Sequence, residues 1–142
     1  MRKSSNRTSS PRSSEIGYTV ANREQALDFM AKWPGFGEQR WYTDALGCTQ
    51  ISFSWRSMPA GTGGRGSYGH RHPGIEEVYL VLSGTATFKI DDDVLAVGPL
   101  TAIKVDADSY RSLHNDTDGE VQLVAISVRS DAETERQDNF WD

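Results

Sequence analysis

The sequence of 142 residues has only one cysteine, Cys48, and no apolar run long enough to span a bilayer. A single cysteine excludes an internal disulfide, and the missing apolar run excludes a transmembrane helix. The sequence also lacks the apolar core of a signal peptide, so we expect a cytoplasmic protein. A chain of this length buries one hydrophobic core, and a second independent domain is not expected.

Basic residues are fewer than acidic ones, and the two kinds of charge are unevenly placed. The formal net charge is −5, yet residues 1–14 carry four basic residues and no acid. Residues 131–142 carry five acids and one arginine. The body between these ends is therefore acidic, which argues against a phosphate-binding surface. We expect neither nucleic acid nor a membrane as a partner.

Composition divides the chain into three segments. Residues 1–15 contain no large apolar residue after Met1, so they are predicted to form a disordered basic tail. Residues 16–130 are predicted to form the folded domain. Residues 131–142 form an acidic C-terminal tail, whose Phe140 and Trp141 are expected to pack onto the body or onto a second copy of the chain.

The spacing of apolar residues predicts an all-β domain with one short N-terminal helix. The helix is expected between Ala21 and Trp33, where apolar residues recur at intervals of three and four after a candidate N-cap, Asn22. From residue 40 onward, short alternating segments are separated by turn residues, and eight to ten strands are expected. The clearest segments are residues 48–58, 77–82, 85–90, 94–97, 101–105, 110–115 and 121–128. Regular turn spacing of this kind is typical of a closed or nearly closed barrel.

Two histidines and a glutamate form the candidate functional centre. His70 and His72 are two residues apart on a predicted strand, so their imidazoles point to the same face. Pro73 and Gly74 fit a type II turn, which would fold the next strand back and place Glu77 beside the histidines. Two imidazoles and one carboxylate suit a divalent ion: iron, manganese, nickel, copper or zinc.

The same residues carry a resemblance to a known family. The sequence matches the first motif of the cupins: a glycine, five residues, His-x-His, three or four residues, a glutamate, six residues and a second glycine. The matching positions are Gly64, His70, His72, Glu77 and Gly84. The resemblance implies a cupin-type jelly-roll β-barrel, commonly a homodimer, with these histidines and the glutamate facing inward toward a metal. It covers roughly residues 48–128.

The second cupin motif is present only as a skeleton. Aligned on Asn115, it places Arg111 where the resemblance implies a fourth ligand, a histidine. His114 is the remaining histidine, but it is expected to face the other side of its strand. An arginine stays protonated and cannot ligate, and its charge about 5 Å from a divalent ion would cost on the order of 6 kcal/mol at an effective dielectric of about 20.

Arg111 therefore has three alternative roles. It turns aside and leaves a three-ligand metal, it binds an anionic ligand next to the metal, or it pairs with Glu77 in a metal-free barrel. Tyr79 shares a face with Glu77 and is a second candidate for substrate contact, while Phe88 and Trp55 are expected to line the interior.

Two functions from different classes follow. The first is a metal-dependent enzyme, an oxygenase, isomerase, lyase or cyclase, in which His70, His72 and Glu77 hold the ion and Arg111 anchors a small anionic substrate. The second is a non-catalytic barrel that binds or senses a small molecule, with Glu77 paired to Arg111 and no functional metal. The intact first motif favours the enzyme.

Overall fold

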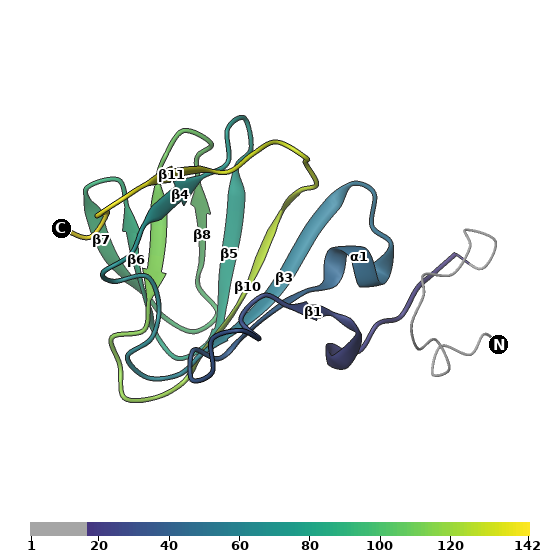
Figure 1. The fold of residues 1–142 in the computed structure, drawn as a ribbon, viewed down its shortest axis with the longest axis horizontal. Coiled ribbons are helices and arrows are strands. Elements are labelled where there is room, and N and C mark those ends of the chain that lie inside the picture. Colours follow the sequence, from purple (N-terminus) through teal and green to yellow (C-terminus); the bar gives the residue numbers. More distant parts are fainter. Residues whose placement is uncertain (1–16) are drawn as a thin grey trace.

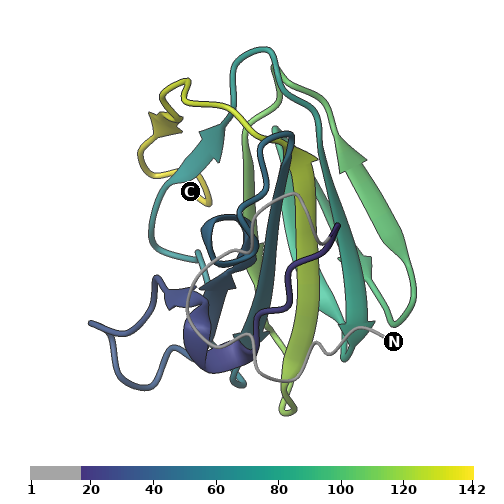
Figure 2. The ribbon, with the colours of Figure 1, turned by 90° about the vertical axis from the view of Figure 1, so that its right-hand side faces the viewer.

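The structure is a computed structural model that describes residues 17–142. The predicted disordered tail, residues 1–15, lies outside the described residues. The chain forms two antiparallel sheets that enclose a common core (Figures 1 and 2). One sheet has the strand order β1-β2-β3-β10-β5-β8, and the other has the order β11-β4-β9-β6-β7. The all-β jelly-roll barrel that the sequence predicted is confirmed.

Most of the strands lie close to the predicted segments. They are Leu27–Asp28 (β1), Glu38–Trp41 (β2), Ile51–Met58 (β3), Gly69–Arg71 (β4), Glu77–Ser83 (β5), Ala86–Ile90 (β6), Asp93–Val97 (β7), Ala102–Val105 (β8), Arg111–His114 (β9), Val121–Val128 (β10) and Glu135–Gln137 (β11). Strand β5 shows the physical reason for the agreement. Its inward residues Tyr79 and Val81 are buried in the core, while the alternate positions Val78 and Leu82 are exposed.

The predicted helix between Ala21 and Trp33 is wrong. Asn22 does cap a helical turn, Arg23–Gln25, but this is a short 3₁₀ helix. The chain then becomes extended, because Leu27 and Asp28 pair with β2 and satisfy their backbone groups in a sheet instead. The α-helix among the described residues is Tyr42–Leu46 (α1). No helix in residues 17–142 is long and apolar enough to cross a membrane.

Both glycines of the motif occupy positions that exclude a side chain. Gly84 ends β5 with a φ of +75°, and a Cβ atom there would lie 2.5 Å from the carbonyl oxygen of Glu120. A Cβ atom on Gly64 would lie 2.0 Å from the Oγ atom of Ser112 in β9. These close approaches tie the loop and the turn to their neighbouring strands.

The C-terminal segment is part of the second sheet. Strand β11 pairs with β4, and Figure 1 shows the two strands running side by side. Phe140 is only 3% exposed and packs on its own chain, and the Nε1 atom of Trp141 donates a hydrogen bond of 2.7 Å to Ser112 Oγ. Strand β4, which carries His70 and leads directly into His72, is therefore held between β11 and β9.

Candidate metal centre

The structure brings the three predicted ligands together. His70 lies on β4, His72 follows it directly, and Glu77 begins β5. The turn between them has the predicted form, since Gly74 has a φ of +77° and the Ile75 amide donates to the His72 carbonyl at 3.0 Å. One candidate ligand atom from each of the three side chains lies within 4.8 Å of the others.

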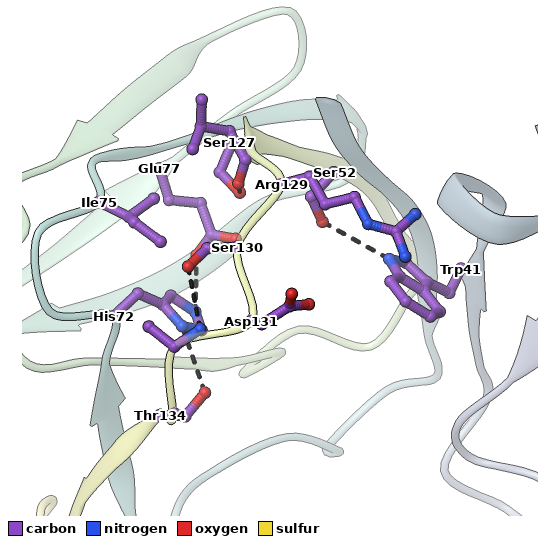
Figure 3. A pocket seen from close by; sticks show the side chains of 12 residues that line it. Trp41, Ser52, His72, Ile75, Glu77, Ser127, Arg129, Ser130, Asp131 and Thr134 are labelled. Carbon is purple, nitrogen blue, oxygen red and sulfur yellow. Dashed lines mark hydrogen bonds and ion pairs between the residues drawn. The ribbon is translucent and has the colours of Figure 1, made fainter. Parts of the chain in front are cut away.

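The imidazole of His72 is oriented from both sides. Its Nε2 atom lies 3.6 Å from Oε1 of Glu77, and its Nδ1 atom lies 3.3 Å from Oγ1 of Thr134. Figure 3 shows His72 and Glu77 facing one pocket, with Thr134 reaching the histidine from the C-terminal segment. A partner on the second ring nitrogen is how proteins fix the orientation of metal-ligating histidines.

Glu77 has its own supporting partner in Tyr79. The Tyr79 hydroxyl donates a hydrogen bond of 2.5 Å to Glu77 Oε1, and the tyrosine is buried. Burial, followed by the charge of Glu77, raises the pKa of Tyr79 well above its ordinary value, so the hydroxyl remains a donor. The neighbouring Glu76 is exposed and lies 3.9 Å from Lys104, as strand alternation predicts.

Both histidines are neutral at neutral pH. Burial, together with the smaller effects of the nearby His72 and Arg111, lowers the pKa of His70 to about 3. The pKa of His72 is also lowered, chiefly by burial, although the Glu77 carboxylate opposes the shift. Neutral imidazoles have a ring nitrogen lone pair available for an ion, so the donor set fits a divalent metal.

Arg111 is fully buried and lacks a counter-charge. It lies opposite His70 in the backbone register of β4 and β9, and its exposed fraction is 0%. Its Nη2 atom donates to the carbonyl of Asp106 at 3.4 Å, whereas Nε and Nη1 have no partner. The pairing of Arg111 with Glu77, one of the predicted alternatives, is absent: the ion-pair contact of Glu77 within the described residues is to His72.

The other residues of the second motif have structural roles. His114 lies outside the cluster, where its Nδ1 atom accepts from the Arg65 amide at 3.3 Å. Asn115 is fully buried, and its Nδ2 atom donates to the carbonyls of Met58 and Gly119 at 3.0 and 2.7 Å. Asn115 thus ties β3 to the turn before β10.

A cavity of about 230 Å³ lies behind the cluster, inside the barrel. The register of β3, β10 and β5 arranges the inward residues of its wall in three levels. Ser52, Ser127 and Glu77 lie at one level, Ser54, Ala125 and Tyr79 at the next, and Arg56, Leu123 and Val81 at the deepest. A second pocket of about 180 Å³, lined by His72, Glu77 and residues 127–132, forms the mouth (Figure 3).

Arg56 is the functional candidate that sequence reasoning missed. It lines the cavity together with Ser52 and Ser54, so the inward face of β3 is the polar one. The expectation that Trp55 lines the interior is wrong; its ring lies on the opposite face of β3, under the guanidinium of Arg23 at 5.5 Å. Phe88 is buried in the core as expected. The alternation Ser-Phe-Ser-Trp-Arg separates the two faces of β3, and its polar half is the one that faces the cavity.

The fold and the cluster together define a small β-barrel with a candidate metal centre at its open end. The chain belongs to the cupin family: the cupin domain matches residues 57–127, half of the chain. A search of curated proteins finds no match to this sequence.

Solved structures share the fold at low sequence identity. A cupin protein from Bacteroides fragilis is 21% identical, with a TM-score of 0.63 over 82% of this chain and 88% of its own. A sugar phosphate isomerase of the cupin superfamily from Silicibacter pomeroyi is 18% identical, with a TM-score of 0.64 over 83% and 86%. Streptomyces PAC13, in a structure with uridine, is 13% identical, with a TM-score of 0.62 over 82% and 88%. At these identities the likeness concerns the fold.

Proposed function

We propose that the protein is a metal-dependent cupin enzyme that acts on a small anionic substrate in the barrel cavity. The observation that carries the proposal is the convergence of His70, His72 and Glu77, whose candidate ligand atoms lie within 4.8 Å of one another at the cavity. Three protein ligands leave open positions for a substrate on the ion.

A divalent ion bound by these three residues would act as a Lewis acid or activate oxygen. The residues of this chain would do the rest. Tyr79 and Thr134 hold Glu77 and His72 in place. Arg111 adds a buried positive charge next to His70, which favours an anion in the cavity.

The size of the cavity limits the substrate. A volume of about 230 Å³ is below the roughly 300–1,000 Å³ of pockets for drug-sized ligands. Two proteins with the same fold are described as a sugar phosphate isomerase and as a complex with uridine. They support a small-molecule substrate here, and the unpaired arginine charge supports an anionic one.

Metal analysis of protein purified without chelators or a histidine tag tests the proposal. We expect about one divalent ion per chain, lost on His72→Ala and retained on His114→Ala, which removes a histidine outside the cluster. The second variant controls for the general loss of an imidazole. A protein without metal that is fully folded, or equal metal content in both variants, would contradict the proposal.

A non-catalytic barrel that binds or senses a small molecule is the second candidate. The buried charge of Arg111 beside the histidines favours it, because that charge opposes a divalent ion. A protein that binds small anions but holds no metal would support this second function. The two candidates therefore differ in metal content before any substrate is known.

We also propose that the protein is a homodimer. The outer face of the first sheet is apolar and exposed at the ends of β3 and β10, where Ile51, Val128 and Ile126 are 51%, 60% and 40% exposed. Ile51 and Val128 are direct neighbours across the two strands, so these side chains form one patch. Light scattering should give twice the chain mass, and Ile126→Glu should shift it to the monomer. A monomeric wild-type protein would contradict the dimer.

A further inference from the structure

Among the described residues, the interior of the barrel holds more buried arginine side chains than carboxylates to pair with them. Arg56 lines the cavity, its Nε atom is buried without a partner, and the described residues offer it no ion pair. Arg111 is a second buried guanidinium with unpartnered nitrogens. Glu77 is the carboxylate that lines the same cavity. Because buried charges in proteins are normally paired, two cations against one anion leave a place for a negative ligand.

Of the two arginines, Arg56 is the one that faces the ligand space. Arg111 has 0% exposure and does not line the cavity, whereas Arg56 does. Arg56 is level with Leu123 and Val81, two inward positions deeper along the wall than the level of Glu77. Glu77 and Arg56 therefore lie at different depths of the cavity wall.

The neighbours of Arg56 supply further polar groups. Gln39 is its direct partner across β2 and β3, and Ser54 is the next inward residue of β3. Neither the Gln39 amide nor the Ser54 hydroxyl has a side-chain partner among the described residues. The two can complete the hydrogen bonds of an oxyanion held by the guanidinium.

We infer that Arg56, with Gln39 and Ser54, binds a carboxylate at the floor of the cavity, so that the ligand is a small carboxylate whose other end faces His70, His72 and Glu77. This inference rests on the proposed function for the role of the metal end, but the carboxylate site itself does not require the metal.

A carboxylate fits this floor better than a phosphate. The planar fork of an arginine matches the two oxygens of a carboxylate. Phosphate sites usually add several backbone amides from a helix N-terminus or a loop. Here β3 is paired on both sides, with β2 and with β10, so its backbone amides are engaged in the sheet.

Titration with succinate as the probe, followed by calorimetry and by the ¹⁵N–¹H signal of the arginine Nε groups, tests the inference. The signal of Arg56 is assigned by its loss in Arg56→Met. We expect succinate to shift this signal and Arg56→Met to weaken succinate binding about 10- to 100-fold, the range for a hydrogen bond to a charged group. Arg136→Met removes the same charge from an exposed position and should leave the affinity unchanged.

The outcomes separate the two proposals. An Arg56 signal that does not move at millimolar succinate, or equal affinity in the wild type and Arg56→Met, would overturn the carboxylate site even if metal is bound. Tighter binding of inorganic phosphate than of succinate would overturn the choice of carboxylate. Binding of succinate that depends on Arg56 in a protein without metal would uphold this inference while the metal-dependent function fails.

Discussion

Replacing the buried Arg111 by methionine should stabilise the protein, although most substitutions at fully buried positions destabilise. Nε and Nη1 of Arg111 have no partner and the residue is 0% exposed, so folding removes two donors from water without compensation. Each such group costs about 1–3 kcal/mol. The hydrogen bond to Asp106, at 3.4 Å, returns about 1 kcal/mol. Methionine has a similar length and no charge, so Arg111→Met should raise the free energy of unfolding by about 1–5 kcal/mol.

Urea denaturation followed by tryptophan fluorescence measures this difference in chelator-treated protein at neutral pH. Arg136→Met, which removes the same charge from an exposed position, is the matched control and should change stability by less than about 0.5 kcal/mol. The same Arg111→Met variant should bind a divalent metal at least about 10-fold more tightly than the wild type, because it removes a repelling charge beside His70. An Arg111→Met protein that is less stable than the wild type by more than about 1 kcal/mol would refute the reasoning, since the guanidinium would then be paired within the fold.

Two further predictions concern single hydrogen bonds. Tyr79→Phe removes the hydroxyl that donates to Glu77 at 2.5 Å and should lower the metal affinity about 10- to 100-fold, measured by competition with a fluorescent chelator. Tyr68→Phe, at an exposed position, is the control and should leave the metal affinity unchanged. Equal losses of affinity in the two variants would argue against an orienting role for Tyr79. The hydrogen bond from Arg65 lowers the pKa of Asp116 from 3.8 to about 2, so this pair stabilises the folded state above the unfolded pKa, and that contribution is lost as the pH falls toward 2. The difference in urea midpoint between the wild type and Asp116→Asn should therefore be small, because the pair is exposed. This difference should shrink below about pH 4. A difference that does not change with pH would contradict the prediction.

Most of the features that the sequence predicted correctly are set by interactions between residues close together in the chain. The turn at Pro73 and Gly74 follows from local backbone preferences, and strand β10 occupies Val121–Val128, as its alternating pattern predicts. Local spacing likewise puts His70 and His72 on one face, and the turn returns Glu77 to them. These features depend on interactions over a few residues, which a single sequence displays directly.

The tertiary structure decided the features that depend on distant partners. The segment after Asn22 has a helical spacing of apolar residues, but pairing of Leu27 and Asp28 with β2 offered its backbone a sheet. The inward face of β3 is set by its register with β10, which turns Arg56 rather than Trp55 into the barrel. Alternation along one strand divides its residues into two faces, but only contact with another strand selects the face that is buried.

The same distinction applies to the site. The sequence by itself determined the candidate metal ligands and the presence of Arg111 at the place of a fourth ligand. Only the tertiary structure showed that Arg111 has no counter-charge and that Tyr79 and Thr134 orient two of the ligands. The physical reason is that a buried charge or hydrogen bond is defined by every group around it, and one of those groups, Thr134, reaches His72 from 62 residues further along the chain.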